Sequence, residues 1–592
     1  MKDDAKDLLS QAEDRPALVK TRTRRGVSPR ILLCLVLCAV LALLPRLVHQ
    51  RLFSSRLLLL PDSLVQGTCP QVGAIFPAGP NGELWGKLSA LYAQVDYEER
   101  AVAWLSDAVR IPTELYDDMG LVGEDERWEA FRPFNEYLVE AFPRIHSTVK
   151  LTKVNTYGLL YEWLGTDADL KPLLLMAHSD VVPVDPATAD QWAHPPYSGH
   201  FDGERIWGRG SSDDKNGLIA AMAVIETLLE HDFQPRRTII MSFGFDEEGG
   251  GPYSQGAQAL ANLLLDRYGK DAFAMIIDEG SGYVEQFGTV FAIPAIGEKG
   301  YANVHVEVKT PGGHSSIPPA HTSIGILSSL LVHLESNQEN AHLIRTEPLY
   351  QYLQCVAEHA PDVSRDLRTA LVKGRHSDRA LREAEKIVFQ DAETKALAGT
   401  TQAVDVIYGG VKSNALPEQA AAIVNHRIAT DSSLGAMRAR YIHLLAPLAA
   451  AFNLSYTAFG TSILGPTTET LGELIVTNPD GLEPAPTVPT DPGAKPFALL
   501  SGTIRATYAK RREALGGARE VLVAPGIISG NTDTVYYWDL SAHIFRYNHN
   551  DLGTGGLGNI HTVNESMGVE SFMEEILFFT TLILNADDAE LL

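Results

Sequence analysis

Short apolar segments alternate with helical ones in the second quarter of the chain, and this alternation limits the possible folds more than any other feature. The segments 159–165, 172–178, 237–246 and 274–279 are nearly continuous apolar runs, as in strands that are buried on both faces. Residues 216–231, which lie between them, have the apolar spacing of a helix. The pattern predicts an α/β domain with a central mixed, mostly parallel sheet that helices cover on both sides.

A different pattern begins near residue 297. Residues 300–311 alternate strictly between apolar and polar side chains, as a half-exposed strand does. The segments that follow complete a β-α-β-β-α-β order, which is typical of ferredoxin-like modules: 323–337, 403–410, 420–428, 434–452 and 454–460. A polar helical stretch at about 345–400 interrupts this order, and a Pro-rich loop at 477–496 follows it. We therefore predict a small α+β domain inserted into the larger one.

Acidic residues and histidines stand where the predicted strands end. His178 and Asp180 are two residues apart, so in a strand they point the same way. They lie at the C-terminal end of the strand, where open α/β sheets place their sites. Further acidic residues follow other strands or open a helix, and a histidine lies in a Gly-rich loop: Asp213, Asp214, Asp246, Glu247, Glu248, Asp278, Glu279 and His561. Taken singly, each is typical of a solvated carboxylate or a satisfied histidine.

Taken together, these residues predict a metal centre. Carboxylates at the strand ends of one sheet must lie close together, and unpaired buried charges cost several kcal/mol each. Such a cluster therefore needs cations. Two histidines with several carboxylates and no cysteine form a ligand set for Zn²⁺, and Mn²⁺ or Co²⁺ also suit it. The number of carboxylates exceeds the needs of one metal ion and favours a two-metal site.

Charge and cysteine content exclude other classes of protein. The chain has 592 residues, 45% hydrophobic and 21% charged, so it is long enough for more than one globular domain. Residues 1–56 contain 11 Lys/Arg and 5 Asp/Glu, a net +6, so a total charge of −25 leaves −31 for the remainder. This acidic body argues against nucleic-acid binding. Two of the four cysteines lie in an apolar N-terminal segment, so the body holds at most one pair, Cys69 and Cys355, and no disulfide framework.

The N-terminal segment predicts a membrane anchor. Basic residues precede the apolar run 31–44, which approaches the thickness of a bilayer when it is extended to residue 48. A cleaved signal peptide and a buried helix are the alternatives, but the charged region is long for the former and nothing amphipathic supports the latter. We expect a cytosolic basic tail at 1–30, a transmembrane signal anchor at 31–48, and a lumenal or secreted body. The sequon at Asn453 would then be open to glycosylation.

Seven motifs carry a resemblance to a known family. They extend from about residue 170 to 566 in the family's order: "MAHSDVVPV", "WAHPPYSGHFDGERIWGRGSSDDKNG", "FGFDEEGGG", "IIDEGS", "KTPGGHSS", "SNALPE" and "IHTVNES". The chain resembles the di-zinc aminoacylase/carboxypeptidase metallopeptidases, and among them the membrane-anchored Gly-Xaa carboxypeptidases of fungal vacuoles. The resemblance implies a stalk at 49–90, a catalytic domain in two parts at 91–296 and 463–592, and a lid and dimerisation domain at 297–462.

The resemblance also implies roles for individual residues. Two Zn²⁺ ions per subunit would have five protein ligands: His178, Asp213, Glu248, Asp278 and His561. Asp213 would bridge the two ions and precede a cis peptide to Asp214. Asp180 would orient the imidazole of His178, and Glu247 would be the general base of hydrolysis.

Substrate-binding residues follow from the same resemblance. His314, supplied by the partner subunit, would stabilise the tetrahedral oxyanion. Asn414, Arg427 and Thr532 would lie near the substrate carboxylate. Some relatives have a further arginine after the last lid strand, but this chain reads "FGTSILGP" there and has none. A second sequon at Asn564 lies three residues after His561, so a glycan at Asn564 would crowd the site.

The expected activity is a zinc-dependent hydrolysis of the C-terminal peptide bond of short peptides, by a homodimer that contacts the membrane only through its anchor. Hydrolysis or synthesis of N-acyl, particularly fatty-acyl, amino acids is the alternative within the family. A non-catalytic lumenal receptor on the same scaffold would lack a metal ligand or the base. All of these residues are present, which argues for an enzyme.

Overall fold

The computed structural model describes residues 67–249, 254–491, 493–515, 520–553 and 557–590. By internal contacts the chain divides into two units, Met1–Pro61 and Asp62–Leu592. The predicted basic tail and signal anchor lie outside the described residues. Within the described ranges, no helix has both the length and the apolar character that crossing a membrane requires.

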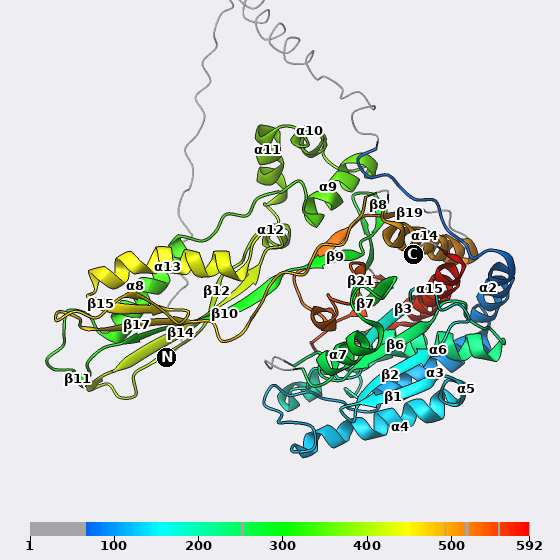
Figure 1. The fold of residues 1–592 in the computed structure, drawn as a ribbon, viewed down its shortest axis with the longest axis horizontal. Helices are drawn as coiled ribbons and strands as arrows, with labels where there is room; N and C mark the ends of the chain where they lie inside the picture. The colour runs from blue at the N-terminus through cyan, green and yellow to red at the C-terminus, as the bar shows by residue number, and fades with distance from the viewer. Residues whose placement is uncertain (1–66, 250–253, 492, 516–519, 554–556, 591–592) are drawn as a thin grey trace, which may run out of the picture. The chain divides into compact units, whose positions relative to one another are not determined.

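A ten-stranded sheet forms the centre of the α/β domain (Figure 1). Its strands run in the order β1 (Lys150–Val154), β2 (Gly158–Trp163), β6 (Ile239–Gly244), β3 (Leu173–His178), β7 (Met275–Gln286), β21 (Ile544–Asp551), β9 (Ala295–Glu298) and β20 (Gly526–Ile528). Off this path, β8 (Thr289–Ala292) pairs with β7 and with β19 (Val521–Val523). The central strands β6, β3, β7 and β21 are parallel, whereas β1 and β2 are antiparallel. The predicted mixed α/β sheet is therefore confirmed.

Helices cover both faces of this sheet, which explains why its strands are apolar without alternation. Leu173 and Leu175 of β3 belong to a core that includes α6 (Lys215–Glu230) and α15 (Val569–Asp588). Leu174 faces the opposite core, beneath α7 (Ala257–Tyr268). Further helices join the first core: α3 (Val95–Val109), α4 (Phe131–Ala141), α5 (Pro143–Thr148) and α14 (Lys495–Ala514). A small separate sheet contains β4 (His200–Phe201), β5 (Arg205–Trp207), β22 (Leu557–Gly558) and β23 (Ser566–Gly568).

The second sheet has the predicted β-α-β-β-α-β order, followed along the chain by three further strands. Its order is β12 (Ala403–Gly409), β14 (Gln419–Ile428), β10 (Gly300–Lys309), β17 (Gly472–Thr477), β15 (Leu454–Ala458) and β16 (Thr461–Leu464), with β18 (Gly481–Leu482) also paired to β10. The helices α8 (Ser323–Ser336) and α13 (Leu434–Ala451) share its apolar core (Figure 1). Because β17 and β18 pair with β10, this sheet continues beyond the predicted end of the inserted domain at 462.

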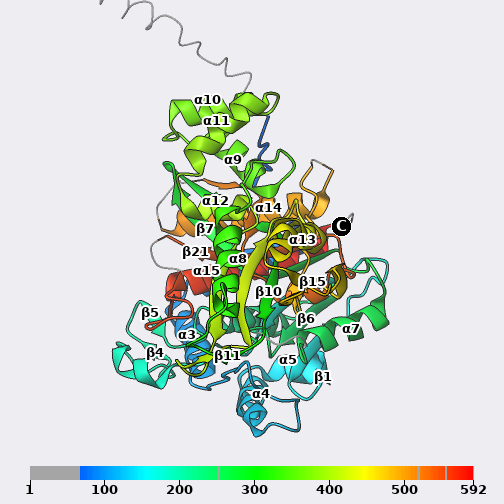
Figure 2. The same ribbon diagram turned by 90° about the vertical axis from the view of Figure 1, so that its left-hand side faces the viewer.

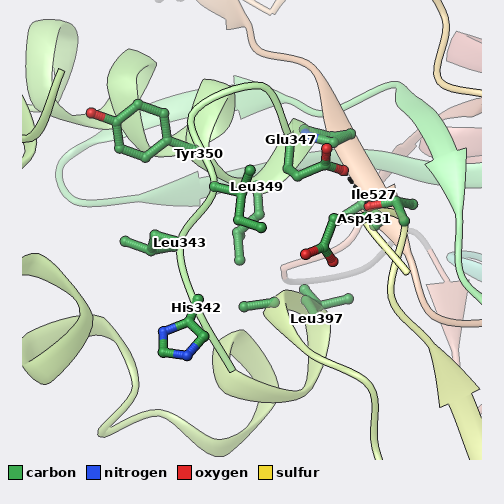
Figure 3. Close-up of a pocket in the computed structure, with 12 residues that line it drawn as sticks. His342, Leu343, Glu347, Leu349, Tyr350, Leu397, Asp431 and Ile527 are labelled. Atoms are coloured by element: carbon green, nitrogen blue, oxygen red, sulfur yellow. Dashed lines mark hydrogen bonds between the residues drawn. The ribbon is translucent and has the colours of Figure 1, made fainter. Parts of the chain in front are cut away.

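The polar stretch at about 345–400 is a helical segment between α8 and β12, as the sequence predicts. It consists of α9 (Pro348–His359), α10 (Arg365–Gly374), α11 (Asp378–Val388) and α12 (Ala392–Ala398). The helices α10 and α11 pack side by side (Figure 2). Leu349 and Leu397 of this segment surround a small pocket together with Ile527 of β20 (Figure 3). The helical segment is thus in contact with an edge strand of the large sheet.

The described part of the predicted stalk at 49–90 is packed against the body rather than extended. The helix α2 (Gly79–Tyr92) has Leu84, Leu88 and Tyr92 at four-residue spacing, so one face is apolar. That face contributes to the core that also contains α15. The segment before α2 is held by a disulfide between Cys69 and Cys355 of α9, the only pair that the sequence leaves available in the body.

Removing this disulfide should destabilise the fold. Cys69 and Cys355 are 286 residues apart in sequence, so the bond closes a long loop and restricts the unfolded chain. We expect Cys69→Ser with Cys355→Ser to lower the free energy of unfolding by about 2–5 kcal/mol. Denaturant unfolding followed by circular dichroism measures this loss. An unchanged midpoint in the double variant would show that the bond contributes nothing to stability.

Candidate metal centre and active-site cleft

The predicted site residues gather at one edge of the large sheet. His178 is the last residue of β3, and Glu247 and Glu248 follow β6, the parallel neighbour of β3. Asp213 lies in the turn before α6, and its peptide bond to Asp214 is cis, as the resemblance implies. Because parallel strands end on the same side of a sheet, residues far apart in sequence meet there.

Carboxylates from three segments surround His178, whose side chain is buried. Its Nε2 atom lies 3.2 Å from Oδ1 of Asp213 and 3.4 Å from Oε1 of Glu279. Oε2 of Glu247 is 4.0 Å away. On the other side of the ring, Nδ1 lies 3.1 Å from the carbonyl oxygen of Asp180 and 3.3 Å from its Oδ1. The imidazole is therefore held from behind and presents Nε2 to the acidic cluster.

Asp213 connects this cluster to a second one around His561. Its Oδ2 atom lies 2.9 Å from Nε2 of His561, while its Oδ1 faces His178. Nε2 of His561 is also 3.0 Å from Oε1 of Glu248. Asp180 contacts both sides, because its Oδ2 accepts a 2.9 Å hydrogen bond from the backbone amide of Glu248. Asp213 thus lies between the two histidines, with one carboxylate oxygen beside each imidazole.

Glu279, rather than Asp278, reaches into this cluster. Two groups of described residues have ligand atoms within 4.8 Å of one another: His178, Asp213 and Glu248, and His178, Asp214 and Glu279. Asp278 belongs to neither and is buried beside Thr532. After Glu279 the chain has Gly280 at φ +155°, and a Cβ there would lie 2.6 Å from Arg546. The pairing of β7 with β21 shifts register at this point, so the two acidic neighbours face different surroundings.

The electrostatics of the cluster fit a cation site. Burial raises the pKa of Glu247 well above its usual range, and the carboxylate of Glu279 adds to the rise. Burial also raises the pKa of Glu279 to about 8, although His178 opposes the rise. Hydrogen bonds with Asp213 and Glu248 raise the pKa of His561 to about 10. Cations among these groups would keep the carboxylates ionised and the imidazoles neutral, which are the forms that ligate metals.

A cleft extends from the acidic cluster to the second sheet. On the side of the second sheet, the cleft is lined by Arg427 of β14 and Tyr301 of β10. These two residues lie opposite each other in the antiparallel strand pair. The guanidinium lies 6.0 Å from the centre of the Tyr301 ring. Among the described residues that line the cleft, Arg427 is the only lysine or arginine. Thr532 also lines the cleft, and its hydroxyl donates to Glu298 over 3.1 Å.

Several lining residues were not singled out from the sequence. An apolar wall comes from the segment before α4 and includes Leu115, Met119 and Trp128. Asn531, in the loop after β20, lies beside Arg427. For the cleft wall around Arg427, the sequence offered only two signals. These were the strict alternation of residues 300–311 and the position of Arg427 on a half-exposed strand. They could indicate Tyr301, but nothing in the sequence pattern pointed to Asn531 or to the apolar wall.

His314 and Asn414 do not line this cleft. His314 ends the strand β11 (Gly313–His314), which pairs with β13 (Ala415–Leu416) in a two-stranded sheet. Asn414 immediately precedes β13. Both are exposed, and the amide of Ser315 donates to the carbonyl of Asn414 over 3.2 Å. Within one chain, the structure therefore brings four of the five predicted ligands together with Glu247, Arg427 and Thr532: His178, Asp213, Glu248 and His561. Asp278 lies outside the two groups of ligand atoms, and His314 and Asn414 lie outside the cleft.

The mixed α/β sheet carries a carboxylate between two histidines at the ends of its strands. The class of protein follows from comparison with known families. Residues 174–585 match Peptidase family M20/M25/M40, and the chain belongs to this family. The protein is therefore a metallopeptidase, as the motifs predict.

The relatives and solved structures agree with this assignment. The chain is 40% identical to carboxypeptidase S of Saccharomyces cerevisiae over 83% of its own length and 85% of that protein. It is 30% identical to the N-fatty-acyl-amino acid synthase/hydrolase of Homo sapiens, over 86% and 92% of the two chains. The fold matches human carnosine dipeptidase 1 with a TM-score of 0.53 at 16% identity, covering 87% of this chain and 100% of that one. The predicted class of metallocarboxypeptidase is confirmed.

Proposed function

We propose that this metallocarboxypeptidase hydrolyses the C-terminal peptide bond of short, Gly-Xaa-type peptides and releases the C-terminal amino acid. The observation that carries this proposal is a single cleft with the carboxylate of Asp213 between two histidines and one guanidinium, that of Arg427, on its wall. A free α-carboxylate on the leaving residue would bind that guanidinium. The scissile carbonyl would then face the acidic cluster.

The donor set supports two zinc ions per chain. His178, Asp213 and Glu279 would hold one ion, and Asp213, Glu248 and His561 the other. Zinc, when bound, would supply a Lewis acid that polarises the scissile carbonyl and lowers the pKa of an attacking water. These ligands replace the predicted Asp278 by Glu279, because the Glu279 carboxylate is the one that lies beside His178.

The chain's own groups would handle the protons. Glu247 lines the cleft beside both clusters without belonging to either group of ligand atoms. It would accept a proton from the attacking water and pass it to the leaving amine. Asp180 would keep the proton of His178 on Nδ1, because its carbonyl and carboxylate oxygens both lie beside that nitrogen. The lone pair on Nε2 would then remain available for a metal ion.

Loss of Arg427 should remove the preference for a free carboxylate. We expect Arg427→Ala to lower kcat/KM for an N-acyl-Gly-Leu substrate about a hundredfold, because truncating one partner of a desolvated ion pair costs several kcal/mol. The same variant should leave kcat/KM for the matching leucinamide nearly unchanged. Arg427→Lys keeps the charge but not the planar pair of donors of a guanidinium. Its kcat/KM for the N-acyl-Gly-Leu substrate should therefore lie between those of the wild type and Arg427→Ala.

Equal losses on the carboxylate and carboxamide substrates would contradict the role of Arg427. Fatty-acyl amino acids present the same carboxylate, so this comparison does not choose between the two substrate classes. The apolar wall of Leu115, Met119 and Trp128 is the feature that favours an acyl chain as the second candidate. A substrate panel that pairs glycyl dipeptide derivatives with long-chain acyl amino acids separates the two.

The second sheet would act as a lid and a dimerisation domain. Its edge strand β12 exposes Ile407 and Tyr408, and Val411 follows the strand. Val332 of the neighbouring helix α8 is also exposed. An edge strand with an apolar surface is a template for pairing with another chain. A second copy on this surface would account for the exposed position of His314 and Asn414, which would complete the partner's cleft.

A mixing experiment tests this sharing of residues. Chains with His314→Ala and chains with Glu247→Gln should each be inactive as homodimers. A mixed dimer would contain one cleft with both residues intact, so randomly mixed subunits should recover about a quarter of the wild-type activity. Mixed chains that stay as inactive as the separate variants would contradict a role for His314 in the partner's cleft.

A lumenal or secreted location fits the chemistry of the body. The disulfide between Cys69 and Cys355 is typical of an oxidising compartment. Asn453 of the first sequon is exposed at the start of β15. By contrast, the Oδ1 atom of Asn564 accepts a 2.6 Å hydrogen bond from the amide of Ala193. We therefore propose the vacuole or another part of the endomembrane system as the location, with Asn453 as the glycosylated site.

A further inference from the structure

We propose that Asn531 is a positioning residue for substrate recognition, because it holds the guanidinium of Arg427 in place without neutralising it. This inference rests on the proposed function, in which Arg427 binds the α-carboxylate of the leaving residue. Nη1 of Arg427 donates to Oδ1 of Asn531 over 3.2 Å. Both residues line the cleft, so the contact lies where the carboxylate would bind.

The hydrogen bonds fix the orientation of the Asn531 amide. Its Nδ2 atom donates to the carbonyl oxygen of Lys299 over 2.6 Å. A guanidinium can only donate and a carbonyl can only accept, so a flipped amide would lose both bonds. Asn531 therefore presents a neutral acceptor to Arg427. An aspartate at this position would form an ion pair with Arg427 and compete with the substrate carboxylate.

Asn531 is itself anchored at the junction between the two sheets. Lys299 lies between β9 of the large sheet and β10 of the second sheet, and its side chain is buried. Its ammonium donates to the carbonyl oxygens of Ala396 and Gly399 at the end of α12, over 2.6 and 2.5 Å. On the other side, the amide and hydroxyl of Thr532 both donate to Glu298.

The anchoring explains what this contact adds to recognition. Arg427 belongs to the second sheet, whereas Asn531 belongs to a loop of the α/β domain. Their hydrogen bond joins the two walls of the cleft. On the side of the second sheet, the Tyr301 ring restricts the movement of the guanidinium. A long arginine side chain loses conformational freedom when it binds a carboxylate. Holding it in advance reduces that loss and tightens binding of the ground state.

Paired substrates test the inference. We expect Asn531→Ala to raise KM for N-acyl-Gly-Leu about tenfold, the effect of losing one hydrogen bond to a charged group, with kcat changed much less. Asn531→Asp has nearly the same shape, and it should raise KM further because it neutralises Arg427. Inhibition by free leucine should weaken in parallel, while inhibition by leucinamide should not change. The leucine Ki provides a measurement that does not depend on turnover.

The Arg427→Ala background provides the decisive control. If Asn531 acts through Arg427, adding Asn531→Ala to Arg427→Ala should change KM by less than about twofold. Additive effects in the double variant, or equal losses with leucine and leucinamide, would overturn the inference. Circular dichroism and bound zinc verify that each variant is folded. A wild-type enzyme with no preference for leucine over leucinamide would instead refute carboxylate recognition by Arg427, and with it the proposed function.

Discussion

Glu247→Gln should lower kcat by roughly 10² to 10⁴ while the chain still binds about two zinc ions, because this substitution removes a proton acceptor and leaves the ligand set intact. The carboxylate of Glu247 lies 4.0 Å from Nε2 of His178 but belongs to neither group of ligand atoms. Glutamine has the same shape and cannot accept a proton at neutral pH. Stopped assays with zinc analysis on the same sample measure both quantities.

Its neighbour provides the matched control. Glu248 lies 3.0 Å from Nε2 of His561, so Glu248→Gln should lose activity together with zinc. The two variants differ by one position in sequence and should differ clearly in metal content. Retained activity in Glu247→Gln would reject this residue as the base, and loss of zinc from it would assign it to the ligands instead.

Glu279→Gln and Asp278→Asn should separate the two neighbours that the sequence could not distinguish. Glu279 lies 3.4 Å from Nε2 of His178, and Asp278 is buried beside Thr532. We expect Glu279→Gln to reduce bound zinc to about one ion per chain after dialysis and to lower kcat/KM more than about a hundredfold. The reason is that replacing a ligand weakens metal binding more than replacing a residue that only supports the ligands. Asp278→Asn should keep about two ions.

Zinc titration into the metal-free proteins, followed by competition with a chelator, measures the affinity of each site. The two substitutions are isosteric and convert a carboxylate to an amide in the same way, so packing effects are matched. If Asp278→Asn loses the ion and Glu279→Gln keeps it, the ligand implied by the family resemblance is correct and the one favoured by the geometry is wrong.

The sequence predicted those features that depend on local pattern. Strands that are buried on both faces are continuous apolar runs, so the sequence placed the ends of β3 to within one residue and those of β6 to within two. The site followed from topology, because parallel strand ends must meet at one edge. His178 and Asp213 therefore could be placed together before any geometry was known. The bridging place of Asp213 came from the resemblance.

Features that depend on distant contacts could not be predicted in the same way. The insertion of β17 between β10 and β15 depends on pairing between residues far apart in sequence. The sequence could not distinguish Glu279 from Asp278 because both neighbours are acidic, and only the contacts around Gly280 show which one reaches the cluster. The role proposed for Asn531 depends on two contacts, with Arg427 and Lys299, that no local pattern indicates.

The central claim is that the chain is a two-metal carboxypeptidase, and one titration tests it most directly. The metal-free protein would receive zinc in known increments while the release of free leucine from N-acyl-Gly-Leu is followed. We predict that activity reaches its maximum only when about two zinc ions are bound per chain, and that leucine is released in a one-to-one ratio with the shortened product. Full activity without bound metal, or a fully loaded protein that releases no leucine, would contradict the account.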